Sequence, residues 1–159
     1  MPITNITTEY IADEDRVRLA VTDSSGAPRV LWLTRRLAER LAPALVESLA
    51  QPEVEGSPST PAVSAAQTYA QLEARLTQKP AAAVKVPHNA DDSVVYEIKL
   101  TRLKAGGCRL RFLCKNQSEA TLNLNATHLR QWLELLRLAF KRAQWRQDVW
   151  PNWIQGSTQ

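Results

Sequence analysis

Apolar and polar residues alternate along two short stretches of this chain, residues 16–22 (RVRLAVT) and 109–115 (RLRFLCK). The apolar residues at every second position are Val17, Leu19 and Val21 in the first stretch and Leu110, Phe112 and Cys114 in the second. Arg16, Arg18 and Ala20, and likewise Arg109, Arg111 and Leu113, occupy the positions between them. Such alternation is typical of a β-strand that buries one face. The two stretches are therefore predicted to be equivalent strands in two related halves of the chain.

The same succession of elements follows each stretch: a turn, a second strand and a helix. Leu31 and Leu33 mark the second strand in the first half, and Leu122 and Leu124 mark it in the second half. Thr34 can cap the first helix and Asn125 or Thr127 the second, because short polar side chains accept from the free N–H groups of a first helical turn. The apolar helix stripes are Leu37, Leu41, Leu45 and Leu49 in the first half, and Leu129, Trp132, Leu133, Leu136 and Phe140 in the second.

An additional strand precedes the alternating stretch in each half, at residues 5–12 and 94–103. The predicted fold class is therefore α+β, with two tandem βββα repeats that form one pseudo-symmetric antiparallel-sheet domain with two packed helices. One such unit is marginally stable alone, so we expect the halves to pack together. The expected boundaries are 1–50 for the first repeat, 51–92 for a connector and 93–159 for the second repeat with a tryptophan-rich tail.

The connector holds five of the nine prolines and is rich in alanine, serine and threonine. Such a composition buries little apolar surface, so a flexible segment is predicted. One part differs, because Tyr69, Leu72 and Leu76 recur at helical spacing, and a short helix is expected over residues 66–78.

Composition and motifs narrow the function classes. The net charge of +4 permits an anionic partner. There is no phosphate-binding glycine loop, no GxSxG and no HExxH, and the two histidines lie in separate regions. We therefore predict a non-enzymatic protein with no cofactor and no metal. With no secretory signal, no apolar run of about 20 residues and only two cysteines, a cytoplasmic location and no membrane contact are expected.

Arginines on the polar faces of the equivalent strands form the first candidate site. They are Arg16 and Arg18 in one half and Arg109 and Arg111 in the other. Trp32 alternates with Leu31 and Leu33, so its side chain points to the same outer face. An exposed tryptophan beside arginines can stack on a base while the guanidinium groups contact phosphates. The alternative is that these arginines only solvate the sheet and that Trp32 packs beneath another segment.

The second candidate site is the C-terminal segment, where Trp145, Trp150 and Trp153 lie within nine residues. Tryptophan is enriched at the energetic centres of protein interfaces, so this segment is a candidate anchor for a protein partner. The alternative is that it folds back over the core. The predicted partners are thus single-stranded nucleic acid, as the leading hypothesis, or a protein, including a second copy in a homodimer.

A resemblance to known folds rests on three segments: the glycines before the RLRF strand, that strand itself, and the later passage from a strand into a helix. The residues are Gly106-Gly107, Arg109–Phe112 and Leu122–Leu133. In this arrangement the chain resembles the Pur-alpha, whirly and related single-stranded nucleic-acid-binding folds, whose units usually have four strands rather than three. The resemblance implies that a nucleic acid lies across the curved sheets, on the arginine faces named above.

Overall fold

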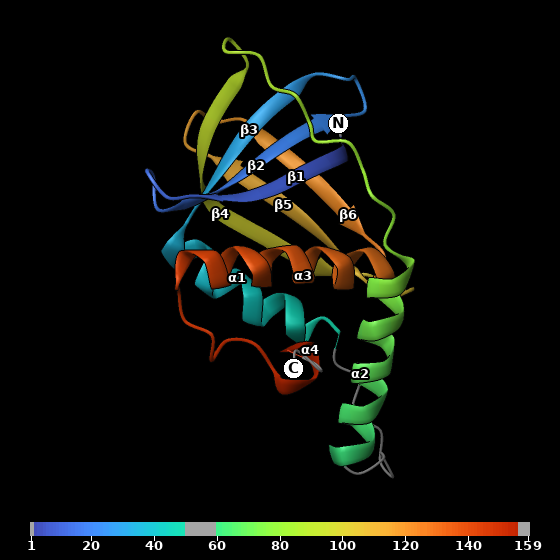
Figure 1. Cartoon of the computed structure of the whole chain (residues 1–159). Coiled ribbons are helices and arrows are strands. Elements are labelled where there is room, and N and C mark those ends of the chain that lie inside the picture. The colour runs from blue at the N-terminus through green and yellow to red at the C-terminus, as the bar shows by residue number, and fades with distance from the viewer. Residues whose placement is uncertain (1, 50–59, 156–159) are drawn as a thin grey trace.

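The computed structural model of the 159-residue chain describes residues 2–49 and 60–155 (Figure 1). Along the chain the elements are β1 (Ile3–Ile11), β2 (Arg16–Asp23), β3 (Pro28–Thr34), α1 (Arg35–Glu47), α2 (Thr60–Thr77), β4 (Asp91–Arg102), β5 (Cys108–Cys114), β6 (Glu119–Leu124), α3 (Ala126–Ala143) and α4 (Asn152–Gln155). The chain is therefore an α+β protein, as predicted, with a six-stranded sheet and four helices among the described residues.

The sheet has the order β1-β2-β3-β4-β5-β6 and is mixed. All neighbouring strands are antiparallel except β3 and β4, which run parallel from the Arg29–Asp91 pair to the Trp32–Val94 pair. We call this parallel pairing the seam. The expectation of a purely antiparallel sheet was wrong, because a connection that contains helices returns the chain to the starting end of β3, and this geometry yields parallel strands. The two outermost strands also meet, because Pro2, just before β1, forms a parallel bridge to Thr121 of β6.

The apolar positions of the alternating stretches face the helices and form the core. The buried strand residues include Val17, Leu19, Val21, Leu31, Leu33, Leu110, Phe112, Leu122 and Leu124. The polar positions of the same strands face the opposite side of the sheet, as is usual for a sheet with one packed face. The period-two pattern thus predicted correctly which side chains enter the core.

Helices α1 and α3 cover the inner face of the sheet (Figure 1). Both begin at predicted caps: the Thr34 side chain accepts from the Leu37 N–H at 3.2 Å, and the Asn125 side chain accepts from the His128 N–H at 2.8 Å. A side-chain contact also ties α3 to β1, since the Trp132 indole N–H donates to the Thr8 hydroxyl at 3.0 Å.

The predicted connector contains an 18-residue helix, α2, which is longer than the sequence indicated. It lies at the side of the molecule, next to α3 and α4, and projects beyond the other helices (Figure 1). Residues 78–90 then cross the outer face of the sheet to reach β4, and the Val84 N–H donates to the Thr7 hydroxyl at 2.8 Å. Residues 51–59, the start of the predicted connector, lie outside the described residues.

Within the described parts of the chain, no helix combines the length and the apolar character needed to cross a bilayer.

Candidate functional site

The four candidate arginines lie on the outer face of the sheet, where most of them have partners. Arg18 forms an ion pair with Glu9 at 3.3 Å, and Arg111 forms one with Glu119 at 2.6 Å. The Arg109 guanidinium donates to the Asn123 side chain at 2.9 Å. Arg16 is half-buried and stands opposite Thr34. The two ion pairs neutralise the charges of Arg18 and Arg111, whereas the amide of Asn123 leaves the charge of Arg109 uncompensated.

The strand register separates the two arginine pairs. Arg18 stands opposite Trp32, and Trp32 stands opposite Val94 of β4. Arg111 stands opposite Lys99, five positions farther along β4. At about 3.3 Å per residue this offset is roughly 16 Å, in addition to the width of the intervening strands. The structure therefore does not bring Arg16 and Arg18 together with Arg109 and Arg111 in one cluster.

The outer face of the first three strands is partly covered. Trp32 is half-buried, and its indole N–H donates to the Asp92 carboxylate at 2.7 Å. Ala20 and Val30 lie on the same face by register, yet they are only 0% and 4% exposed. The outer face of β4, β5 and β6 differs, since Tyr96, Lys99, Thr101, Arg109 and Arg111 are all exposed there. The open part of the sheet is thus the second half.

The tryptophans after α3 fold back onto the core, the alternative that the sequence left open. Trp145 and Trp150 are each 3% exposed. Their rings meet the Phe140 ring edge-on at centroid separations of 5.3 Å and 5.1 Å, and Trp145 also packs against Tyr10 at 5.5 Å. Trp153 is half-buried, with the Arg130 guanidinium 5.5 Å from its ring centre. Two of the three predicted anchor residues are therefore inside the protein.

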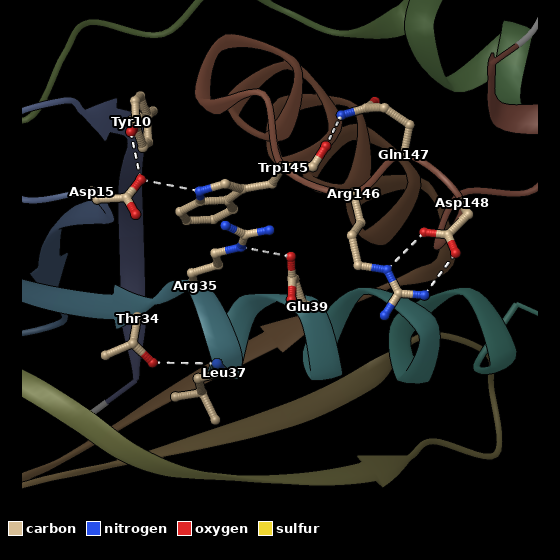
Figure 2. Close-up of polar contacts among 10 residues, drawn as sticks. All are labelled: Tyr10, Asp15, Thr34, Arg35, Leu37, Glu39, Trp145, Arg146, Gln147 and Asp148. Atoms are coloured by element: carbon tan, nitrogen blue, oxygen red, sulfur yellow. Dashed lines mark hydrogen bonds and ion pairs between the residues drawn. The ribbon is translucent and has the colours of Figure 1, made fainter.

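Asp15 links this aromatic cluster to the turn between β1 and β2 (Figure 2). Its carboxylate accepts from the Tyr10 hydroxyl at 2.6 Å and from the Trp145 indole N–H at 3.1 Å. These hydrogen bonds lower the pKa of Asp15, and the bond from Tyr10 contributes most. The same bond raises the pKa of Tyr10. Both bonds are accepted by Oδ1 of Asp15, and together they hold the start of the tail against the turn between β1 and β2.

Helix α2 turns polar side chains toward the protein and large apolar side chains toward solvent. Gln67 and Gln71 face the body of the protein and are 7% and 1% exposed. Tyr69, Leu72 and Leu76, on the opposite side of the helix, are 70%, 44% and 76% exposed. With the exposed Ala65 they form one line along the helix, which we call the α2 stripe. This is an apolar surface that nothing among the described residues covers.

A network of polar side chains holds α2 against α3. Gln71 donates to the Glu134 carboxylate at 3.1 Å and to the Arg130 carbonyl at 3.0 Å. Arg75 and Arg137 form ion pairs with Glu134 at 2.5 Å and 3.1 Å. Burial alone would raise the pKa of Glu134, but these hydrogen bonds and the arginine charges outweigh it and hold the pKa below its usual value.

A surface cleft of about 390 Å³ opens beside the end of α3. Its lining residues are Arg137, Lys141, Gln144, Trp145, Gln147 and Gln155. The cationic and amide groups there offer donors to an anion, although Arg137 already pairs with Glu134. The cleft is open to solvent.

The two cysteines are buried, and the potential metal ligands among the described residues are scattered. Cys108 and Cys114 are free thiols, 0% and 1% exposed, and burial raises the pKa of Cys108 to about 11. A thiol with such a pKa is protonated at neutral pH and is a poor nucleophile. Within residues 2–49 and 60–155, no three His, Cys, Asp or Glu side chains gather as a metal site requires.

The residues that sequence reasoning missed are the inward-facing glutamines of α2. The spacing of Gln67 and Gln71 by four residues was available as a signal, but a line of Tyr and Leu on a helix usually marks its buried side. The polar partners on α3 that reverse this preference are about 60 positions away in the sequence.

Comparison of the chain with protein-family models, with curated proteins and with solved structures finds no match to any of them. The resemblance to Pur-alpha and whirly folds therefore stays a prediction.

Proposed function

We propose that this protein is a non-catalytic binding module that works through protein–protein contact, and that its contact surface is the outer face of α2. The observation that carries the proposal is the inverted helix. Two glutamines of α2 are buried while Tyr69, Leu72 and Leu76 are 70%, 44% and 76% exposed. An apolar stripe on one face of a surface helix is the usual form of a helix that docks into a partner.

The energetics support this interpretation. Complete burial of a leucine or an aromatic side chain is worth about 1.5–3 kcal/mol, so the α2 stripe leaves on the order of 4 kcal/mol of burial free energy unused in the isolated chain. Buried glutamines, by contrast, need every hydrogen bond satisfied. A sequence that only had to fold would favour the opposite arrangement. A partner on the stripe explains why the apolar side faces outward.

Photo-crosslinking tests the proposal. We would place a benzophenone amino acid at Tyr69 and, as a control, at Thr101, which is exposed on the outer face of β4. Irradiated cells should yield protein adducts heavier than 17.8 kDa from position 69 and not from position 101. No adduct at position 69, or equal yields of protein adducts at both positions, would contradict the proposal.

Nucleic-acid binding is the second candidate, and the open outer face of β4, β5 and β6 favours it. Arg109 and Arg111 are exposed there together with Tyr96, which is 56% exposed and offers a ring for stacking. The Arg109→Ala/Arg111→Ala variant should then bind a labelled single-stranded oligonucleotide at least tenfold more weakly. Binding should also weaken steeply between about 50 and 200 mM salt. An unmutated protein that binds no oligonucleotide at low salt would exclude this candidate.

We also propose that the two halves are pseudo-symmetric repeats. The succession of three strands and a capped helix in β1-β2-β3-α1 and in β4-β5-β6-α3 supports this. So do the two parallel contacts, one at the seam and one between Pro2 and Thr121, because a twofold axis through the sheet would exchange them. The cytoplasmic location stays a prediction from the sequence.

A further inference from the structure

We infer that the partner of the α2 stripe is a second copy of this chain, bound so that the two α2 helices run antiparallel. The inference rests on the proposed function, because it names the occupant of the same surface. It follows from the spacing, the sizes and the charges of the residues on that face.

The spacing of the α2 stripe is palindromic. Ala65, Tyr69, Leu72 and Leu76 are separated by four, three and four residues, which is the spacing of the core positions in a two-helix coiled coil. The pattern is symmetric about the midpoint between residues 70 and 71. A twofold axis at that point places Tyr69 against Leu72 of the second copy and Ala65 against its Leu76. The stripe is therefore complementary to itself, as a twofold interface requires.

The side-chain sizes favour the antiparallel direction. In the antiparallel pair each large residue meets a residue of a different size, so the thickness of the contact varies less along the helix than in a parallel pair. A parallel pair would place Ala65 against Ala65 and leave a gap at one end, while two Tyr69 side chains would crowd the middle. Core packing penalises both voids and crowding.

Helix α2 has few charged residues, and the antiparallel pairing places no two like charges opposite each other. The charged residues of α2 are Glu73 and Arg75, and Arg75 is engaged by Glu134. The twofold axis brings Glu73 level with Thr68 of the second copy and Arg75 level with its Ala66. Depletion of charge at the centre of a contact is a mark of protein interfaces.

The position of α2 leaves room for the second helix. Gln67 and Gln71 face α3, so the body of each copy lies on the side of α2 opposite to the stripe. Figure 1 shows α2 projecting beyond the other helices. The exposed stripe presents on the order of 350 Å² of apolar surface per copy, and with flanking residues the pair would bury about 1,000 Å² in total, at the low end of specific interfaces. A weak, concentration-dependent dimer is therefore expected.

Sedimentation equilibrium of the purified full chain tests the association. The mean mass should rise from 17.8 kDa toward twice that value between about 5 and 500 μM. The Leu72→Ser/Leu76→Ser variant should dimerise at least tenfold more weakly. Leu138→Ser is the matched control, because Leu138 on α3 is 45% exposed and lies outside the stripe, so this variant should dimerise normally. A wild-type chain that stays monomeric at 500 μM would overturn the inference.

Cysteine pairing tests the orientation. Under mild oxidation, an equal mixture of the Tyr69→Cys and Leu72→Cys variants should form the mixed 69–72 disulfide faster than either variant links to itself. The native Cys108 and Cys114 are buried, so the wild-type chain should form no disulfide-linked dimer and serves as the control. Faster 69–69 linkage would indicate a parallel pair and contradict the inferred orientation.

The two proposals can fail separately. If position 69 crosslinks only to another protein and the pure chain stays monomeric, the inference of a second copy is wrong while the proposed function survives. If the chain is monomeric and position 69 gives no protein adduct, both are wrong.

Discussion

At the residue scale, Gly107 occupies a position that only glycine fits. Its φ is +80°, in the region that side chains rarely adopt, and an added Cβ would lie 2.0 Å from the Leu124 carbonyl oxygen. The turn between β4 and β5 therefore lies directly against the end of β6. Gly26, in the turn between β2 and β3, has a similar φ of +84° but nothing within 4 Å of an added Cβ.

Alanine variants of the two glycines separate the cost of the left-handed backbone conformation from the cost of the close contact. Gly26→Ala should lower the free energy of unfolding by about 1 kcal/mol, because only the left-handed conformation is strained. Gly107→Ala should cost roughly 3 kcal/mol or more, because the strand end must also move. Urea denaturation measures both values. Equal losses would mean that the contact with Leu124 contributes nothing.

Trp150 is buried for its bulk rather than for its hydrogen bond. It is 3% exposed, and its indole N–H finds no hydrogen-bond partner among the described residues. Trp150→Ala should therefore lower stability by about 3–5 kcal/mol through the cavity it leaves. Trp150→Phe should cost far less, since it keeps the ring and removes an unsatisfied donor. Thermal unfolding distinguishes the two, and similar losses in both variants would contradict this account.

Several single residues could be predicted from the sequence. The Thr34 and Asn125 caps follow from local chemistry, because a cap bonds to the N–H three residues later. Trp32 was assigned to the outer face correctly, but its bond to Asp92 depends on a strand sixty residues away. Side chains with distant partners are the ones that sequence reasoning did not place.

At the element scale, the docking of α2 depends on one carboxylate. Glu134 has a side chain that is 8% exposed and receives bonds from Gln71, Arg75 and Arg137. Its removal would leave the guanidinium groups of Arg75 and Arg137 close together without a counter-charge. Breaking a buried pair in this way is costly.

Glu134→Gln should lower the free energy of unfolding by about 2–4 kcal/mol at pH 7. The pKa of Glu134 is lowered in the folded state, so its contribution is complete above the unfolded value of about 4.5 and is lost as the pH falls through the folded pKa. The difference between wild type and variant should thus shrink in acid. Urea denaturation at pH 7, 4 and 3 measures it. A difference that stays constant over this range would contradict the role of the charge.

Glu39→Gln provides the control for that experiment. Glu39 pairs with Arg35 on α1 at 2.9 Å, and the two side chains are 19% and 50% exposed. Solvent-accessible pairs four residues apart on a helix contribute about 0.3–0.5 kcal/mol, so this variant should remain much closer to wild type than Glu134→Gln.

Element identity was predictable from the sequence, whereas element orientation was not always so. The strands and the helices α1 and α3 follow their apolar periods, because their apolar sides face a core that the same pattern defines. Tyr69, Leu72 and Leu76 correctly indicated a helix, but the buried side of α2 was set by the polar surface of α3. The direction of β4 relative to β3 depends on the path of the connection, which has no local signature.

At the scale of the whole molecule, the mixed sheet distributes the candidate surfaces over different sides. The curved sheet separates the arginines of β2 from those of β5, and residues 78–90 contact the first half of its outer face. The tryptophan segment closes the core beneath α3, which leaves α2 as the apolar element at the periphery. The sequence indicated these segments as candidates, but only their positions in space distinguish a structural role from a binding role.

We expect the seam to affect how long the folded molecule lasts. It pairs Arg29 with Asp91, more than sixty positions apart, whereas the antiparallel ladders join residues at most about twenty positions apart. Closing a long loop is slow, so each three-stranded half of the sheet is expected to form before the seam.

Val94→Ala at the seam should accelerate unfolding and leave refolding unchanged, whereas Leu110→Ala within a ladder should slow refolding. Stopped-flow kinetics measures both rates, and slower refolding of the Val94 variant would contradict this order of assembly. On this order of assembly the seam is among the last contacts to form and among the first to open, so its four pairs of residues contribute to the lifetime of the native state.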